Sequence, residues 1–175
     1  MFISLQRLIW LPLVIVILNV GFSEAKKKKI VITQYQGQVV KCHDGDTCHL
    51  QTDKNKIKIR FHGIDAPELK QQYGKQARDH LLSLIIDKQV LAKCSGHSFD
   101  RQTCEVFLNG ENINKRMVQD GWAWESQRYS SGAYKAEAEA AKLKKIGIWK
   151  DSTESPYCFR HKKNKKCTQN KLYME

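Results

Sequence analysis

The sequence predicts an α+β fold that is mainly β: an OB-fold five-stranded barrel with about three helices. Three observations support this prediction. Residues 30–42, 47–53 and 56–64 are rich in β-forming residues and follow one another through short turns. Residues 73–88 have the apolar spacing of a helix, and residues 89–94 and 103–109 have the composition of a second strand pair. This order of elements is that of an OB-type barrel, a fold suited to nucleic acid.

The first two strands are separated by Asp44-Gly45, which is a strong hairpin signal because glycine accepts the positive φ of a tight turn. The runs on either side, Gln38 to Val40 and Thr47 to Leu50, are β-rich. Asp46 is therefore expected at a hairpin tip, where Asp44 has the simpler role of a turn residue that bonds its own backbone.

The third strand alternates between apolar and polar side chains, so one of its faces needs a core. The apolar face is Ile57, Ile59 and Phe61, and the polar face is Lys58, Arg60 and His62. The strand runs into a turn that carries Asp65 and Glu68. If the first hairpin lies beside this strand end, Asp46 meets Asp65. An arginine beside such acids suits phosphodiester cleavage, which uses a charge clamp, a metal ligand and a base.

Three segments have helical patterns. The first is residues 73–88, the second is a short helix capped by Asn112 or Asn114 and ended by Gly121, and the third is residues 133–145. The apolar faces expected for the first and third helices are Ala77, Leu81, Leu84 and Ile85, and Ala136, Ala140 and Leu143.

The N-terminus has the layout of a secretory signal peptide, with Arg7 before an apolar run and Ser23-Glu24-Ala25 as a cleavage site. Residues 1–25 are therefore expected to be removed after Ala25, and the alternative is an uncleaved membrane anchor. The expected domains are residues 26–150, the folded domain, and residues 151–175, an irregular, basic, cysteine-containing tail. We expect a secreted or periplasmic protein, without stable membrane association after cleavage, and a monomer.

The formal net charge is +12, which indicates a polyanionic partner and a binding strength that falls with salt. Six cysteines in a secreted chain indicate three disulfides, whose pairing has fifteen possibilities. Proximity in the sequence favours Cys42–Cys48, Cys94–Cys104 and Cys158–Cys167. A zinc site at Cys42-His43 and Cys48-His49 is the alternative, although neighbouring strand residues point to opposite faces.

Several motifs recur in the order and spacing of one family. The chain resembles the thermonuclease family, the staphylococcal-nuclease-like phosphodiesterases, over roughly residues 30 to 150. The matching motifs are Asp44-Gly45-Asp46-Thr47, Lys58 to Glu68 with its Gly63-Ile64-Asp65-Ala66-Pro67-Glu68 end, Tyr73-Gly74, Arg101, Asn109-Gly110, Asn112-Ile113-Asn114, Gly121-Trp122-Ala123-Trp124, Tyr129 and Gly147-Ile148-Trp149.

The resemblance implies one Ca²⁺ ion, held by Asp46, Asp65 and the backbone carbonyl of Ala66, and hard oxygen ligands suit that ion. It implies that Glu68 orients or deprotonates the attacking water. It further implies that Arg60 and Arg101 stabilise charge on the scissile phosphate.

The role assigned to Arg101 depends on how this part of the chain is aligned with the family. The family commonly has an aspartate-arginine-tyrosine-glycine-arginine run here, and placing Arg101 on the last arginine keeps the spacing to Asn109-Gly110. Placing Asp100-Arg101 on the first two positions would remove the catalytic arginine. Under the first alignment Phe99 replaces the tyrosine of a nucleotide-binding position and Asp100 replaces the glycine.

Tyr129 resembles a second nucleotide-binding residue, and Gln127 stands where the family has another tyrosine. The resulting expectation is a nuclease that cleaves DNA and RNA with low sequence specificity and leaves 3′-phosphate ends. The alternatives are a non-catalytic OB-fold protein that binds nucleic acid, and a membrane-tethered adhesion or uptake protein.

Overall fold

The computed structural model describes residues 31–163 and Cys167, so the expected signal peptide and its cleavage site after Ala25 lie outside the described residues. The strands are β1 (Thr33–Cys42), β2 (Thr47–Gln51), β3 (Lys56–Phe61), β4 (Ile64–Asp65), β5 (Gln89–Ser98), β6 (Arg101–Leu108), β7 (Glu111–Asn112) and β8 (Trp124–Glu125). The helices are α1 (Gly74–Ile85), α2 (Ile113–Gln119), α3 (Gln127–Ser130), α4 (Lys135–Leu143), the 3₁₀ helix η1 (Gly147–Trp149) and α5 (Pro156–Arg160). Within the described residues, no helix is both long and apolar enough to span a membrane.

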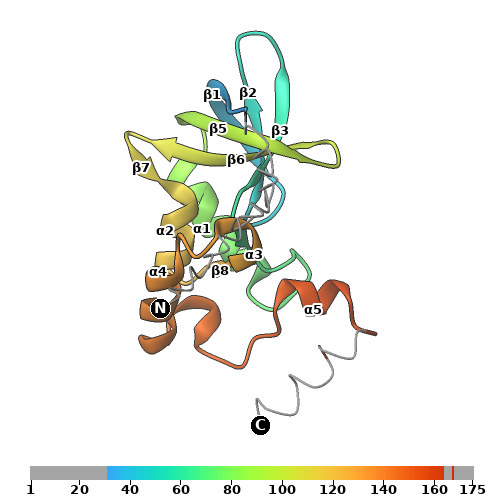
Figure 1. Cartoon of the computed structure of the whole chain (residues 1–175), viewed down its shortest axis with the longest axis vertical. Helices are drawn as coiled ribbons and strands as arrows, with labels where there is room; N and C mark the ends of the chain where they lie inside the picture. The colour runs from blue at the N-terminus through green and yellow to red at the C-terminus, as the bar shows by residue number, and fades with distance from the viewer. Residues whose placement is uncertain (1–30, 164–166, 168–175) are drawn as a thin grey trace, which may run out of the picture.

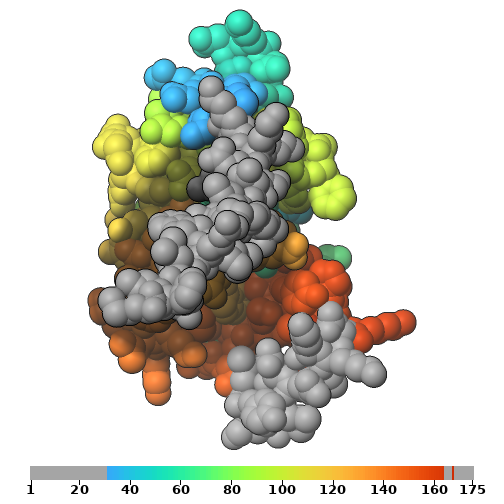
Figure 2. Space-filling model, in the orientation of Figure 1, coloured from blue at the N-terminus to red at the C-terminus, as the bar shows by residue number. Residues whose placement is uncertain are grey.

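The main sheet has the strand order β3-β2-β1-β5-β6-β7, and β3 also pairs with β6 in parallel. The pairings therefore run through five strands and return to β3, which confirms the predicted mainly β, OB-like fold. The strands of the main sheet gather in the upper half of Figure 1, helices α1, α2 and α4 lie below them, and α5 lies at the lower right. Figure 2 shows the β2–β3 hairpin projecting at the top and the α5 segment on the lower right surface.

The core fills the space between the sheet and the first helix. Ile59 and Phe61 of β3 are buried as their alternation predicts, and Leu81 and Ile85 of α1 are buried in the same cluster. Deep burial of such side chains contributes about 1.5–3 kcal/mol each, so this cluster holds α1 against the sheet. The polar face of β3, which carries Arg60, consequently points away from the core.

All three expected disulfides are present. Cys42 lies directly opposite Cys48 in the β1–β2 ladder, and Cys94 lies directly opposite Cys104 in the β5–β6 ladder. The zinc alternative is wrong for Cys42 and Cys48, because their sulfurs are bonded to each other. The two cross-strand bonds brace the hairpins that end near Asp46 and Arg101.

The helices differ from the prediction in number and in one buried face. Three additional short helices, α3, α5 and the 3₁₀ helix η1, are present among the described residues, and α5 lies in the tail that was predicted to be irregular. It begins at Pro156, after Ser155 whose hydroxyl accepts a hydrogen bond from the Cys158 backbone N–H at 3.3 Å. The predicted buried face of α4 is wrong: Leu143 is 86% exposed and Ala141 is buried.

The tyrosine before α4 gives the reason for that error. The hydroxyl of buried Tyr134 donates to Glu105 of β6 at 3.0 Å, which fixes the start of the helix, and Ala141 is the helix residue that is buried. Burial, with the nearby charge of Glu105, raises the pKa of Tyr134, so the hydroxyl remains a donor. Alanines occur on several faces of this helix, so apolar spacing alone predicted the wrong face to be buried.

Replacing Asn114 by alanine is expected to destabilise the fold by about 2–4 kcal/mol, because the Val106 N–H and the His62 carbonyl lose this partner and the Cys104 carbonyl keeps only the His62 N–H. The fully buried Asn114 accepts from Val106 N–H at 2.9 Å and donates to the carbonyls of His62 and Cys104 at 2.8 and 3.1 Å. Urea unfolding measures the effect. The matched control is Asn112→Ala, which removes the helix cap on Lys115 N–H and costs about 1 kcal/mol. Equal losses in the two variants would contradict this role of Asn114.

Candidate active site

Asp46 and Asp65 lie together at one end of the barrel, as the sequence predicted. Thr47 is paired with Arg60 across β2 and β3, and the Asp46 carbonyl accepts from Phe61 N–H at 2.8 Å. The guanidinium of Arg60 joins the two acids: its Nη2 is 2.7 Å from Asp65 Oδ1, and its Nη1 contacts Asp46 Oδ1. Two acids from different turns of the chain are therefore held by one planar fork.

Arg60 is enclosed, since its side chain is only 18% exposed. Burial lowers the pKa of Arg60, and the charges of Asp65 and Asp44 oppose that shift. Arginine keeps its charge through such shifts because its ordinary pKa is above 12. The site therefore contains a fixed positive charge inside a group of acids.

Asp46 is held rigidly and is 3% exposed. Its Oδ2 accepts from Ala66 N–H at 2.7 Å, and its Oδ1 accepts from the Thr47 hydroxyl at 3.1 Å. Asp44 Oδ1 accepts from Asp46 N–H at 3.1 Å, which is the turn role expected for Asp44. Two neighbours of the proposed ion, Asp46 and Ala66, are thus adjacent in space.

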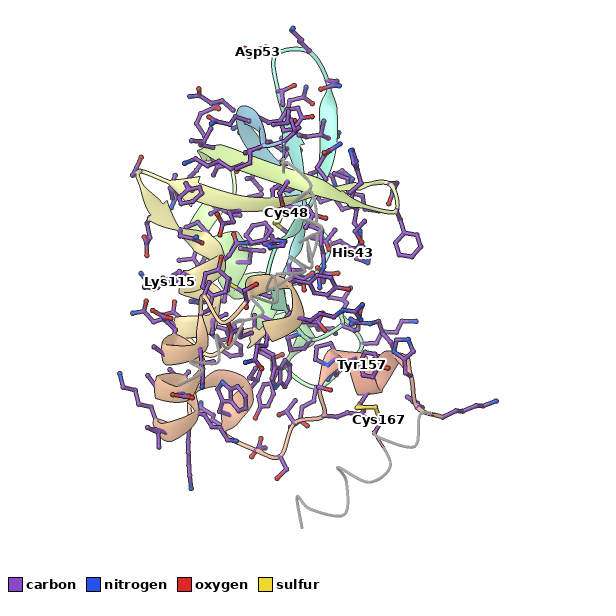
Figure 3. All side chains as sticks on the ribbon, in the orientation of Figure 1. His43, Cys48, Asp53, Lys115, Tyr157 and Cys167 are labelled. Atoms are coloured by element: carbon purple, nitrogen blue, oxygen red, sulfur yellow. A yellow bond between two sulfur atoms is a disulfide. The ribbon has the colours of Figure 1, made fainter. Side chains whose placement is uncertain are left out.

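Glu68 lies in the loop between β4 and α1. Its backbone N–H donates to Gln71 Oε1 at 3.1 Å. Its carboxylate Oε1 accepts from Arg160 Nη1 at 2.6 Å, and Arg160 Nη2 donates to Asp65 Oδ2 at 2.9 Å. In Figure 3, His43 in the β1–β2 turn and, below it, Tyr157 on α5 are labelled on the right side of the molecule.

Arg160 is the site residue that the sequence reasoning missed. It follows Glu68 by 92 positions and belongs to the segment predicted to be an irregular tail, so no local pattern indicated it. Burial opposes its charge, but the hydrogen bonds from its guanidinium to Asp65 and Glu68 outweigh burial and raise the pKa of Arg160. The basic composition of residues 151–175 was the only feature of the sequence that related to Arg160.

The oxygen donors fit a hard cation. Four carboxylates, from Asp44, Asp46, Asp65 and Glu68, lie around the guanidinium groups of Arg60 and Arg160, which leaves negative charge in excess. Among residues 31–163, no group of three or more His, Cys, Asp and Glu side chains converges as a complete metal cage. An ion here would therefore be held by few side chains together with backbone carbonyl and water, which suits calcium.

Arg101 lies at the start of β6, and its hydrogen bonds are made within its own hairpin. Its Nε donates to the Ser98 carbonyl at 3.3 Å, and its Nη2 donates to Ser98 Oγ at 3.2 Å. Its charge also contributes to lowering the pKa of Arg60, so the two guanidinium groups act on one another through space. The structure brings Arg101 to the edge of the site without joining it to the acids.

The two expected nucleotide-binding rings are exposed. Phe99 is 95% exposed at the β5–β6 turn, where its φ is +57°. The neighbouring Asp100 pairs with Lys58 at 3.1 Å. Tyr129, on α3, is 61% exposed, and the Arg128 guanidinium lies 5.8 Å from the centre of its ring. Both rings are free to stack on a ligand, and neither contacts the acids.

Comparison with known proteins gives one family and several relatives. The family model described as "Staphylococcal nuclease homologue" matches residues 58–151. The chain is 39% identical over 118 residues to "Uncharacterized endonuclease" of Haemophilus influenzae, covering 66% of this chain and 66% of that protein. It is 31% identical over 138 residues to "Uncharacterized endonuclease" of Escherichia coli O157:H7, covering 77% and 90% respectively. It is 30% identical over 141 residues to "Micrococcal nuclease" of Shigella flexneri, covering 72% and 80%. Arg160 lies beyond the matched residues of the family model.

Proposed function

This chain belongs to the family of staphylococcal nuclease homologues, and from that membership we propose that it is a Ca²⁺-dependent nuclease. It hydrolyses phosphodiester bonds of DNA, and also of RNA, with low sequence specificity. The observation that supports this proposal best is the Arg60 fork, which draws Asp46 and Asp65 together beside Glu68. Carboxylates that can bind a hard cation thus lie beside a guanidinium that can bind a phosphate, and phosphodiester hydrolysis requires both.

Asp46, Asp65 and the carbonyl of Ala66 would hold the ion, which when bound supplies electrophilic stabilisation of phosphate oxygen. Glu68 orients a water for in-line attack at phosphorus and takes its proton. Arg60 and Arg101 stabilise the charge that gathers on the phosphate oxygens in the transition state. The 5′-oxygen leaves, and the product ends in a 3′-phosphate, as the family resemblance implies.

The surface beside the site supports a polyanionic substrate. A groove between the β2–β3 hairpin and the β5–β6 turn is lined by His49, Lys56, Ile57, Lys58, Asp100 and Gln102. Burial lowers the pKa of His49, and the charges of Lys58, Lys41 and Lys56 lower it further. A positive potential of this kind attracts a phosphate backbone without regard to base sequence.

We include secretion in the proposal, because the N-terminus has the layout of a signal peptide. The protein is exported, released by cleavage after Ala25, and acts as a monomer in the periplasm or outside the cell. N-terminal sequencing of the exported protein tests this, and a mature chain that begins at Met1 would reject it in favour of the membrane-tethered alternative.

The purified protein is expected to cut single-stranded and double-stranded DNA when calcium is present and to lose that activity in excess chelator, because the acids alone cannot stabilise phosphate charge. Gel electrophoresis of labelled DNA measures cutting, and restored calcium should recover it. Salt-sensitive DNA binding without cutting would support the second candidate, a non-catalytic nucleic-acid-binding protein, and reject the enzyme.

A further inference from the structure

The C-terminal segment delivers Arg160 to the two acids that matter most for the proposed chemistry. Arg160 Nη2 lies 2.9 Å from Asp65 Oδ2, its Nη1 lies 3.3 Å from Asp65 Oδ1, and the same Nη1 lies 2.6 Å from Glu68 Oε1. One guanidinium therefore spans a proposed calcium ligand and the proposed base. Because a guanidinium is planar and donates hydrogen bonds in fixed directions, it fixes both the orientation and the separation of the two carboxylates.

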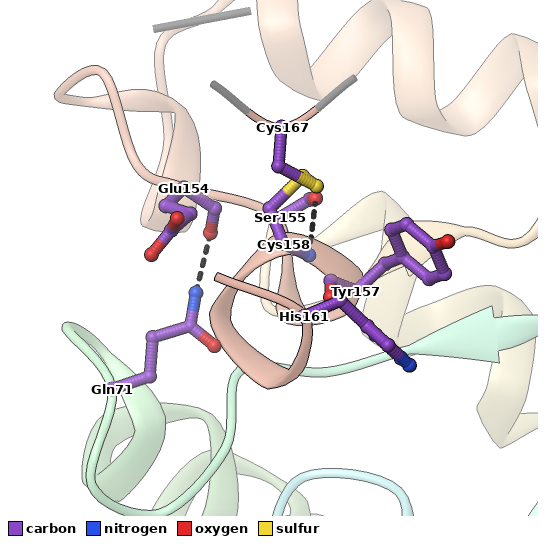
Figure 4. Close-up of a disulfide and its surroundings, with 7 residues drawn as sticks. All are labelled: Gln71, Glu154, Ser155, Tyr157, Cys158, His161 and Cys167. Carbon is purple, nitrogen blue, oxygen red and sulfur yellow. Dashed lines mark hydrogen bonds between the residues drawn. A yellow bond between two sulfur atoms is a disulfide. The ribbon is translucent and has the colours of Figure 1, made fainter. Parts of the chain in front are cut away.

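The segment that carries Arg160 is attached to the Glu68 loop through separate contacts. Gln71, which accepts from the Glu68 backbone N–H, also donates through Nε2 to the Glu154 carbonyl (Figure 4). The Tyr73 hydroxyl donates to Asp151, and Gln72 Nε2 donates to the same carboxylate at 3.3 Å. The loop that orients Glu68 and the segment that holds Arg160 are therefore linked at several points.

The α5 helix is itself anchored. Pro156 and Cys158 are buried, Ser155 caps the first turn, and Cys158 is bonded to Cys167 (Figure 4). Exposed ion pairs usually contribute less than about 1 kcal/mol, because ordering two long side chains costs entropy. Here the helix backbone is also held by these other contacts, so that Arg160 loses less freedom when it contacts Glu68 and Asp65.

The contacts leave room for the proposed reaction. Asp65 accepts three hydrogen bonds, one from Arg60 and two from Arg160, whereas a carboxylate has about four acceptor sites. Arg160 uses Glu68 Oε1, and among the described residues no donor contacts Glu68 Oε2. The arrangement therefore fixes both acids while it keeps one oxygen of Glu68 for water.

We propose that Arg160 is a positioning residue of the active site, which holds Glu68 and Asp65 in their working orientation from the C-terminal segment. This inference rests on the proposed nuclease function. It extends the active site beyond the residues matched by the family model, which end at 151. Because small displacements of a base cost large factors in rate, loss of Arg160 affects turnover more than substrate binding.

The test compares the full chain with Arg160→Ala, Arg160→Lys and a control, Arg116→Ala. Arg116 pairs with Glu111 and Asp120, and its side chain is 39% exposed against 38% for Arg160, so the control removes a comparable clamp away from the site. Steady-state cleavage of DNA gives kcat and KM, a calcium titration gives the half-saturating concentration, and circular dichroism checks the fold. Arg160→Ala is expected to lower kcat about 10- to 100-fold with KM changed less than about threefold, the range found for residues that orient metal-site ligands.

Arg160→Lys should recover part of kcat, since lysine keeps the charge but lacks the fork, and Arg116→Ala should retain wild-type kcat. Unchanged or increased kcat in Arg160→Ala overturns the inference, as does a loss confined to KM. If Arg160→Ala does not fold, Arg160→Gln carries the same expectation, because it keeps much of the side chain. The two possible failures can be told apart. An inactive wild-type protein overturns the proposed nuclease function and with it this inference, whereas an active wild type with an equally active Arg160→Ala overturns the inference alone.

Discussion

Replacing Glu68 by glutamine is expected to lower kcat by about 10²- to 10⁴-fold, which is the contribution of a positioned general base. Glutamine has nearly the same shape and retains an acceptor oxygen for Arg160, which lies 2.6 Å from Glu68 Oε1. It cannot take a proton from water. The change therefore removes the chemistry while it leaves the surrounding contacts largely in place, and KM for DNA should change little.

Steady-state cleavage at saturating calcium measures this effect. The matched control is Glu111→Gln, because Glu111 also pairs with an arginine, Arg116, at 3.0 Å, and lies away from the site. We expect wild-type turnover from the control. Equal turnover in Glu68→Gln and the wild type would remove Glu68 from the proposed mechanism and leave its carboxylate as a partner of Arg160 alone.

The barrel and its acid pair could be predicted from the sequence because both depend on local patterns. Alternation in β3 fixes which face Arg60 occupies. The turn at Asp44-Gly45 was also predicted, but the reason given for its glycine was wrong: Gly45 has no positive φ, and a Cβ there would lie 2.7 Å from the Ala66 Cβ. Once β2 pairs with β3, the pairing of Thr47 with Arg60 brings Asp46 to the guanidinium without further information. The cross-strand disulfides follow in the same way, because each joins two strands of one hairpin.

The contact between Arg160 and Glu68 could not be predicted in this way. It depends on how the chain returns after α4 and η1, and no spacing rule relates a tail residue to a loop that precedes α1. The docking of Glu154 and Asp151 on Gln71 and Tyr73 brings the Arg160 segment to the Glu68 loop. Tertiary contacts of this kind, like the Tyr134 anchor at the start of α4, are decided by the assembled surface rather than by a periodic pattern.

The turn before Arg101 combines a local departure from the family pattern with a strained backbone. Phe99 takes φ +57° at a position where the family has tyrosine, and Asp100 replaces a glycine. A left-handed φ is uncommon for a bulky residue and occurs where the surroundings fix it. Here Ser98 and Arg101 are paired across the turn, and the Cys94–Cys104 bond braces the same two strands. Arg101 is therefore presented from a hairpin that is held closed.

Arg101→Gln is expected to lower kcat by about 10²- to 10³-fold, the cost of removing one donor that meets charge developing in a transition state. In the structure its Nε and Nη2 donate only to Ser98, at 3.3 and 3.2 Å, so stability should change by less than about 1 kcal/mol. Within the part of the chain that the structure describes, Arg101 forms no ion pair with an acid, which separates its role from that of Arg60. Its guanidinium can leave Ser98 for a phosphate at small cost.

Kinetics of Arg101→Gln and Arg101→Lys, beside Arg78→Gln, distinguish the two alignments of this region. Arg78 pairs with Asp79 on the surface of α1, so its replacement controls for the loss of one positive charge. If Arg101 is the transition-state arginine, its lysine variant also loses most of its turnover, because a point charge lacks the planar fork. If Arg101→Gln and Arg78→Gln cleave DNA equally well, the other alignment holds: Asp100-Arg101 then corresponds to the first two residues of the family's aspartate-arginine-tyrosine-glycine-arginine run, and the catalytic arginine is absent. Stabilisation of the phosphate would then fall to Arg60 alone, whose guanidinium is already shared between Asp46 and Asp65.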